Sequence, residues 1–195
     1  MKYLITLITL ITMGISDEGE ISGVTYFDYI NSEDISAFNF ERQYFSYSVQ
    51  ASDDIKYKII FDAGRINKIV DSDGKEEDTR VVIFLKKAQI DYKTSYGNVS
   101  MGIIGMNTYN VQEKNWGFRF IEKSAIDKHK FSSTADLGVG FSRSVIENLN
   151  ISLQIVNGEG YKEPQKDKYY KISFNSTYGE GKLNTNDGYN TGIVY

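Results

Sequence analysis

The sequence contains no cysteine and only one proline, Pro164, in 195 residues. Without cysteine the chain can have no disulfide framework, no thiolate metal site and no cysteine nucleophile. The single proline stands against 17 glycines, 15 tyrosines and 11 phenylalanines, a composition that favours strands and tight turns over helices. The composition therefore predicts an all-β fold.

The chain also has no basic excess and only one histidine. The formal net charge is −4, whereas a nucleic-acid-binding domain normally carries a basic excess, so we expect no nucleic-acid partner. The only histidine, His129, lies between two lysines, which argues against a histidine-rich metal site or a Ser-His-Asp triad. The acidic segment DSDGKEED at 71–78 lacks ligands that an EF-hand loop requires. The sequence thus predicts no metal, no cofactor and no enzymatic activity.

Residues 1–16, MKYLITLITLITMGIS, have the pattern of a secretory signal peptide. Lys2 supplies a short basic start, an apolar run follows, and the small residues Gly14 and Ser16 precede the acidic sequence DEGE. The competing interpretation is a transmembrane anchor, but about a dozen residues rise only about 18 Å as a helix, and the hydrocarbon core is roughly 30 Å thick. No later apolar run is long enough for a helical span. We therefore expect a signal peptide at 1–16 and one exported domain at 17–195.

Segments of alternating polarity recur through this domain. Eight are clear, at 22–30, 38–50, 55–64, 81–93, 98–106, 134–142, 149–157 and 169–178, and a weaker pair follows Gly181. Short turns are expected at 52–54, 95–98, 145–148 and 179–181, and longer links at 31–37, 65–80, 108–133 and 158–168. Short turns at one end and long loops at the other are typical of an outer-membrane barrel.

The segment IKYKIIFDAG, at 55–64, has one apolar face and one mostly charged face. A half-buried soluble strand produces this pattern, and so does a strand between lipid and a wet lumen. The same rule gives uncharged outward sets in later strands: Val99, Met101 and Ile103; Ala135, Leu137, Val139 and Phe141; Ile151, Leu153 and Ile155; Tyr170, Ile172 and Phe174. The opposite sets are too hydrophilic for a packed core. We expect an antiparallel up-and-down transmembrane β-barrel with about 8 to 10 strands present; the alternative is a soluble secreted β-sandwich.

Four features carry a likeness to a known family: an arginine in an aromatic strand at Arg42, FIEKS at the end of a long loop, ADLGVGF at a strand start and NGEG at a strand end. In their order and spacing the chain resembles the phosphate-selective porin O and P family of bacterial outer membranes. The resemblance implies a wide, trimeric barrel lined by basic residues for anions. Because family barrels need more strands, we expect an incomplete chain that lacks its C-terminal strands and forms part of a larger barrel. The alternative is a complete small barrel that ends on the aromatic residue Tyr195.

A pore depends on the charges that line it. The face assignment projects these candidate pore-lining residues into the lumen: Arg42, Lys56, Lys58, Asp62, Lys87, Asp91, Lys93, Asp136 and Lys171. Basic side chains predominate among them, which predicts a weak preference for anions. The alternative is that the charges pair across neighbouring strands and select nothing.

The longest link, at 108–133, is a candidate constriction loop, since long ordered loops tend to be functional. Its candidate residues are Lys114, Arg119 and Lys123. The last two stand four apart, a spacing that places them on one side of a short helix, with Trp116 and Phe120 as anchors on the other. The alternative is an external loop whose charges pair internally.

Together these features predict a bacterial outer-membrane porin, a passive diffusion channel for small hydrophilic solutes with a weak preference for anions such as phosphate. Its expected partners are the lipid bilayer, lipopolysaccharide, small anionic solutes and, as the resemblance implies, further copies in a homotrimer. A non-conducting outer-membrane barrel that acts as an adhesin or scaffold is an alternative. An outer-membrane lipase or protease is disfavoured, because no base can be placed beside a Ser or Asp.

Overall fold

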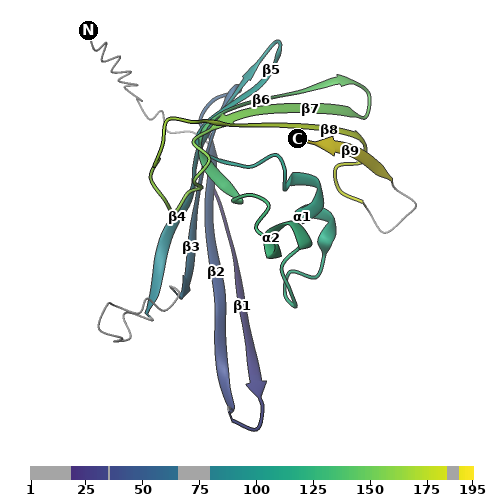
Figure 1. The fold of residues 1–195 in the computed structure, drawn as a ribbon. Coiled ribbons are helices and arrows are strands. Elements are labelled where there is room, and N and C mark those ends of the chain that lie inside the picture. Colours follow the sequence, from purple (N-terminus) through teal and green to yellow (C-terminus); the bar gives the residue numbers. More distant parts are fainter. Residues whose placement is uncertain (1–18, 35, 66–79, 184–188) are drawn as a thin grey trace.

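The computed structural model of the chain describes residues 19–34, 36–65, 80–183 and 189–195 (Figure 1). The predicted signal peptide at 1–16 and the acidic segment at 71–78 lie outside these residues. Among the helices that are described, none has the length and apolar character needed to cross a membrane.

Nine strands form one antiparallel sheet in which each strand pairs with the next along the chain (Figure 1). They are β1 (Glu20–Asn31), β2 (Ser36–Gln50), β3 (Ile55–Arg65), β4 (Val81–Thr94), β5 (Gly97–Gly105), β6 (Ala135–Ile146), β7 (Leu149–Val156), β8 (Lys171–Gly179) and β9 (Asn190–Val194). The predicted all-β, up-and-down topology is confirmed, together with its eight clear strands. Within the described residues β1 and β9 each pair with a single neighbour, so this sheet is open and does not close into a barrel.

The connections differ in length between the two ends of the sheet, because consecutive antiparallel strands reverse direction. At one end short turns occupy 51–54, 95–96 and 147–148, and at the other end longer links occupy 66–80, 106–134 and 157–170. In the turn before β7, Asn148 adopts a left-handed conformation with φ of 64°, which asparagine tolerates better than most residues. The predicted alternation of short and long connections is confirmed from β2 to β8.

Two predicted connections are wrong. The first link, expected to be long, is short, since β1 ends at Asn31 and β2 begins at Ser36. The tight turn expected at 179–181 does not join two strands, because the next described strand after Gly179 begins only at Asn190. Gly179 itself is the last residue of β8 and has a positive φ of 100°, so the glycine marks the end of a strand.

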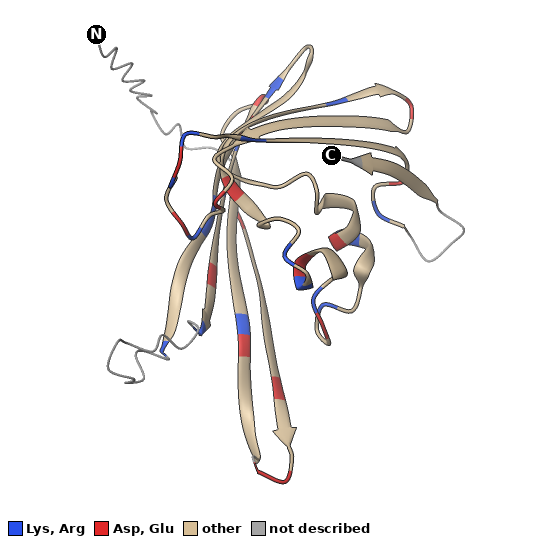
Figure 2. Cartoon of the chain, in the orientation of Figure 1, with Lys and Arg blue, Asp and Glu red and all other residues tan. Residues whose placement is uncertain are grey.

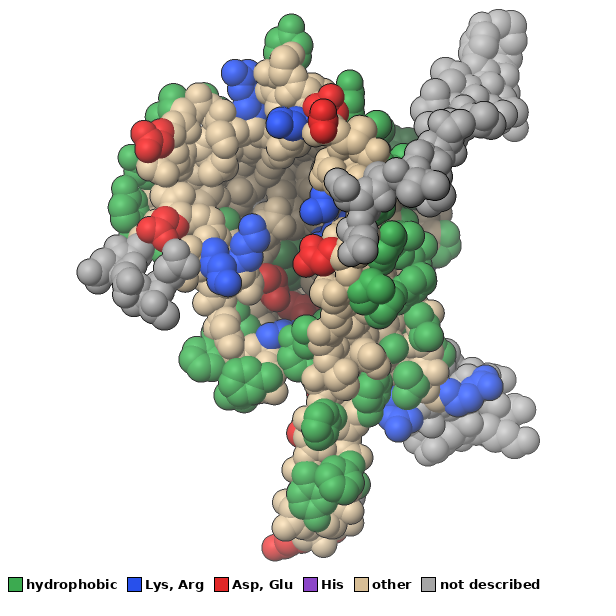
Figure 3. All heavy atoms as spheres, turned by 180° about the vertical axis from the view of Figure 1, so that it is seen from behind, with side chains coloured by type: hydrophobic (Ala, Val, Ile, Leu, Met, Phe, Trp, Pro, Cys, Tyr) green, Lys and Arg blue, Asp and Glu red, His purple; other side chains and the backbone are tan. Residues whose placement is uncertain are grey.

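The two faces of the sheet have opposite character, as the alternation predicts. Large apolar side chains are exposed on the outer face: Ile59, Phe61, Met101, Leu137, Val139, Phe141, Leu153, Ile155, Ile172 and Phe174. Polar side chains are buried on the inner face: Asp62, Asp136, Gln154, Ser173, Asn175 and Thr177. Figure 3 shows apolar side chains around the outside of the molecule and charged side chains gathered about its hollow. A soluble domain has the reverse arrangement, with its apolar face packed on a core.

Ala135 departs from this pattern. It was expected on the outward face, but it is completely buried. The 157–170 link covers it, and the backbone N–H of Tyr161 donates a hydrogen bond to its carbonyl at 3.0 Å.

The 106–134 segment folds onto the inner side of the sheet and contains two short helices, α1 (Asn110–Trp116) and α2 (Ala125–Lys128) (Figure 1). A small apolar cluster joins this segment to the sheet: Ile104, Met106, Tyr109 and Val156, with Ile126 packed against them. The longest link is therefore not a free external loop, because it packs against the inner face of the sheet.

Candidate functional site

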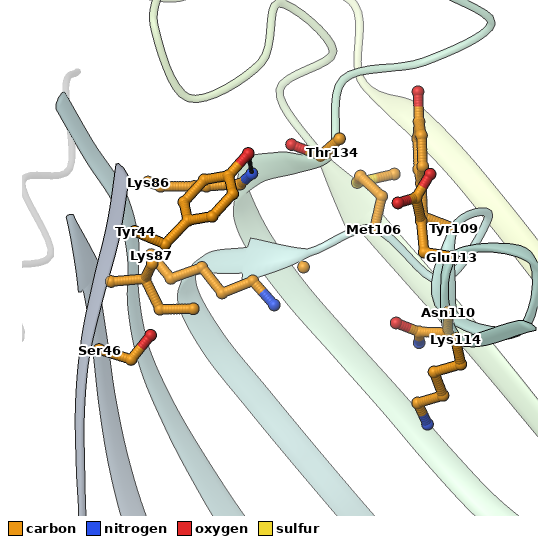
Figure 4. A pocket seen from close by; sticks show the side chains of 12 residues that line it. Tyr44, Ser46, Lys86, Lys87, Met106, Tyr109, Asn110, Glu113, Lys114 and Thr134 are labelled. Atoms are coloured by element: carbon orange, nitrogen blue, oxygen red, sulfur yellow. Dashed lines mark hydrogen bonds between the residues drawn. The ribbon is translucent and has the colours of Figure 1, made fainter. Parts of the chain in front are cut away.

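A pocket of about 350 Å³ lies between the inner face of the sheet and α1 (Figure 4). Lys86 and Lys87 extend into it from β4, and Lys114 belongs to α1 on the opposite side. Its lining also includes Tyr44, Ser46, Ile60, Gly105, Met106, Tyr109, Asn110, Glu113 and Thr134. Two predicted site residues, Lys87 of the wall and Lys114 of the constriction loop, are thus brought together.

Lys86 and Lys87 both face inward because β4 carries a β-bulge. In a regular strand, consecutive side chains point to opposite faces. The β3–β4 register shifts so that Ile60 pairs with Lys87 and Phe61 with Leu85, which leaves Lys86 as the extra residue. Strict alternation assigned only Lys87 to the lumen and therefore missed Lys86.

The electrostatic character of the pocket is basic. Lys58, Lys86 and Lys114 lie close enough to Lys87 for their charges to repel it, and Asp91 partly offsets them. The Asp91 carboxylate accepts hydrogen bonds from Gln89 Nε2 at 2.7 Å and from Ser100 Oγ at 2.5 Å. Clustered cations of this kind raise the local concentration of anions.

Two of the residues that line the pocket, Glu113 and Lys86, are each held by a neighbouring side chain. Ser124 Oγ donates a hydrogen bond to the Glu113 carboxylate. Lys86 Nζ donates to Tyr44 Oη at 3.2 Å and lies 4.3 Å from the centroid of the Tyr44 ring. Among the described residues, Lys87 and Lys114 form no side-chain hydrogen bond or ion pair, and both line the open space of the pocket.

A second polar cluster ties the 157–170 link to β2 and β3. Asp62 is 1% exposed, and its Oδ2 accepts hydrogen bonds from Arg42 Nη1 at 3.2 Å and from Tyr161 Oη at 2.7 Å. Burial, reinforced by the hydrogen bond to Asp62, raises the pKa of Tyr161, so that its phenol remains a donor well above neutral pH. Burial also lowers the pKa of Lys162, whose Nζ lies 4.3 Å from the centroid of the Phe84 ring.

The other predicted pore-lining residues also lie on the inner face. Asp136 Oδ2 accepts hydrogen bonds from the N–H groups of Gly158 at 2.8 Å and Gly160 at 3.1 Å, so this carboxylate holds the 157–170 link. Lys171 Nζ donates to Ser132 Oγ at 2.6 Å and contacts the 106–134 segment. Lys56 and Lys93 are exposed near the short-turn end of β3 and β4.

The short helix predicted to carry Arg119 and Lys123 is absent, because both residues lie in the connection between α1 and α2. Gly117 ends α1 in a left-handed conformation with φ of 69°. The Arg119 guanidinium lies 5.2 Å from the centroid of the Tyr26 ring in β1. Arg119 therefore contacts β1 and is not among the residues that line the pocket, although the Tyr26 ring lies beside Tyr44, which does line it. Figure 2 shows basic and acidic residues interleaved along this part of the chain.

Of the two predicted aromatic anchors, only one has that role. Trp116 Nε1 donates a hydrogen bond to the Glu122 carbonyl at 2.8 Å and closes the connection that follows α1. Phe120 is 69% exposed, and its ring contacts only the neighbouring ring of Phe118 among the described aromatic residues.

No family model, curated protein or solved structure matches the chain. The resemblance to the porin O and P family thus stays a prediction. Among the described residues, no group of three or more His, Cys, Asp or Glu side chains could hold a metal ion.

The sequence reasoning missed Asn107, which follows β5 and is 1% exposed. Its Nδ2 donates hydrogen bonds to the carbonyls of Ser152 and Ser173, each at 3.2 Å. Its Oδ1 accepts a hydrogen bond from Ser173 Oγ at 2.6 Å. One asparagine after a strand gives no signal of this kind, because its partners lie on strands far along the chain.

Tyr109 supplies a contact that depends on pH. Its hydroxyl donates to the Ser132 carbonyl, and burial raises its pKa from 10.0 to about 12, with a further contribution from Asp127. Since the folded-state pKa is the higher one, this stabilisation is fully present below about pH 10 and is lost as the pH rises towards about 12. We expect an alkaline titration followed by tyrosinate absorbance to show a late-ionising step that Tyr109→Phe reduces.

The exposed Tyr96 provides the control for this titration. Tyr96→Phe should leave the late step at its wild-type size. Overlapping late steps in the wild-type protein and Tyr109→Phe would contradict the assignment.

Proposed function

We propose that the chain forms the wall of a bacterial outer-membrane porin, a passive channel for small hydrophilic solutes with a weak preference for anions such as phosphate. The observation that carries this proposal is the polarity of the two faces: the outer face exposes apolar side chains on strand after strand, and the inner face buries polar ones. Removing one large apolar side chain from water gains about 1.5–3 kcal/mol. Lipid would provide that gain along the whole outer face.

In a lipid environment the backbone groups at the edges of the sheet also need hydrogen-bond partners. Unsatisfied backbone groups cost several kcal/mol each in hydrocarbon, so membrane sheets are closed. The proposal therefore requires that β1 and β9, which are open edges among the described residues, be paired in the membrane. Lipopolysaccharide and further copies in a homotrimer are the other partners that it includes.

The pocket lysines support the proposed anion preference. Lys87 and Lys114 face the space between the wall and α1, where solutes would pass. In a salt gradient across a planar bilayer, we expect a reversal potential that indicates mild anion selectivity. Lys87→Glu should lower the anion-to-cation permeability ratio by roughly three- to tenfold, because it changes the local charge by two units in a confined space.

Lys166→Glu is the matched control, since Lys166 is 59% exposed on the 157–170 link and pairs with Glu163 at 3.1 Å. It makes the same change of charge outside the pocket, and its reversal potential should equal that of the wild type. Clear cation selectivity of the wild-type protein would contradict the anion preference. A protein that inserts but carries no current would favour the adhesin or scaffold alternative, and one that purifies without detergent would favour the soluble β-sandwich.

A further inference from the structure

We infer that Asn107 is a positioning residue that latches the 106–134 segment to the inner face of the sheet, so that the segment forms a fixed constriction whose release widens the passage. The second part of this inference rests on the proposed channel function. The latch itself is a property of the fold and is testable without any current.

Asn107 is hydrogen-bonded to three residues of the wall, two on β7 and one on β8. Its backbone N–H donates to Gln154 Oε1 at 2.8 Å, and its Nδ2 donates to Ser152 Oγ at 3.0 Å as well as to the Ser152 and Ser173 carbonyls. Gln154 in turn donates from Nε2 to the Gly105 carbonyl at 2.8 Å. The side chain of Asn107 is thus fully satisfied in a buried site, where leaving any of these groups without a partner is costly.

To make these bonds Asn107 must reach past β6, because it follows β5 and its partners lie on β7 and β8. The inner face of β6 carries glycine at this point. A Cβ built on Gly140 would lie 3.2 Å from Gln154 Cγ and 3.4 Å from Ile104 Cδ1. A Cβ on Gly138 would lie 2.2 Å from the Ile155 carbonyl oxygen. The lack of a side chain at Gly140 therefore leaves the space that Gln154 and Ile104 occupy beneath the segment.

The contacts of the segment are unevenly distributed. On the β7 and β8 side it has the Asn107 bonds and the apolar packing of Met106 and Tyr109. On the β2 to β4 side it faces the pocket. Further along, the segment is attached by the bond from Lys171 Nζ to Ser132 Oγ, by the Leu183 N–H that donates to Asn115 Oδ1 at 2.6 Å, and by Arg119 over the Tyr26 ring. The Asn107 bonds hold the point at which the segment leaves β5. The latch is consequently placed just before α1, the helix that carries Lys114.

Limited trypsin digestion of the folded, detergent-solubilised protein tests the latch. The segment carries basic cleavage sites at Lys114, Arg119, Lys123, Lys128 and Lys130. Cleavage in a folded protein tracks the population of the open form. We expect Asn107→Ala to accelerate cleavage within the segment about 10- to 100-fold, the effect of losing the bonds of one buried polar side chain. Ser173→Ala, which removes only the hydroxyl that donates to Asn107, should give a smaller acceleration.

Asn98→Ala is the matched control, because Asn98 is an exposed asparagine at the start of β5. It should cleave at the wild-type rate. An Asn107→Ala protein whose sheet unfolds at the wild-type denaturant concentration, but whose segment is cut faster, supports a positioning role. Equal cleavage rates in the wild type, Asn107→Ala and Ser173→Ala would overturn the latch. If Asn107→Ala fails to fold, Ser173→Ala alone decides the matter.

Single-channel recording separates the latch from the channel. Higher conductance of Asn107→Ala, together with faster cleavage, supports the whole inference. Faster cleavage with wild-type conductance overturns the constriction and leaves the latch standing. If neither the wild-type protein nor any variant carries current, the proposed channel function is refuted, and faster cleavage of Asn107→Ala still supports the latch.

Discussion

Leu153→Lys is expected to destabilise the protein in lipid vesicles by about 2–4 kcal/mol, the cost of a lysine at the lipid face of a membrane strand. Leu153 lies on the outer face of β7 and is 45% exposed. In a soluble sheet, a lysine at such an exposed position would change the stability by no more than about 0.5 kcal/mol. The size of the effect therefore distinguishes a lipid-facing strand from a solvated one. The measurement is the free energy of unfolding in denaturant, in vesicles.

The control for this substitution lies on the opposite face of the same strand. Asn150 is exposed on the inner side of β7, where Ser144 Oγ donates to its Oδ1 at 2.6 Å. Asn150→Lys should cost less than about 1 kcal/mol, because the lysine remains in water. If Leu153→Lys and Asn150→Lys were equally stable in vesicles, the outer face would not be in contact with lipid.

Arg42→Ala is expected to lower the free energy of unfolding by about 3 kcal/mol, because it leaves the buried Asp62 carboxylate without its cation. Asp62 would keep one of its two observed donors, the hydroxyl of Tyr161. Its Oδ1 has no hydrogen-bond partner among the residues that the structure describes, and Lys162 would remain as a nearby cation. The loss should appear in denaturant unfolding in micelles.

A double substitution tests this explanation. Arg42→Leu combined with Asp62→Leu removes both charges, and it should recover most of the stability that Arg42→Ala loses. Lys128→Ala offers a comparison, since its pair with Glu122 has an N–O distance of 2.7 Å but is exposed, and its loss should cost at most about 1 kcal/mol. Additive losses in the double substitution would show that the stability of this region does not depend on the ion pair.

The strands and their faces could be predicted from the sequence because each depends on local alternation. The pattern in IKYKIIFDAG placed Phe61 outside and Asp62 inside, as the structure has them. Ile60 fitted that pattern least well, and it lines the pocket beside Lys87. The inward position of Lys86 could not be predicted, because a bulge depends on how β4 pairs with β3 and is not visible in the alternation of one strand.

The contacts of the inward segment could not be predicted in the same way. Asn107 and its partner Ser173 are 66 positions apart in the chain, and Asp62 and Tyr161 are 99 apart. Such contacts arise because the 106–134 and 157–170 connections fold back onto the inner face of the sheet. The wrong prediction of a helix through Arg119 could have been avoided from the sequence, because a glycine such as Gly117 is an ordinary signal for the end of a helix.

The position of Trp116 has a spectroscopic consequence. It is the single tryptophan of the chain, and it ends α1 with its indole N–H bound to the Glu122 carbonyl. Tryptophan emission from this protein therefore originates in the inward segment and not in any strand. Fluorescence quenching by a small aqueous solute therefore measures the accessibility of that segment, whereas circular dichroism follows the sheet. The two signals report separately on two parts of one molecule.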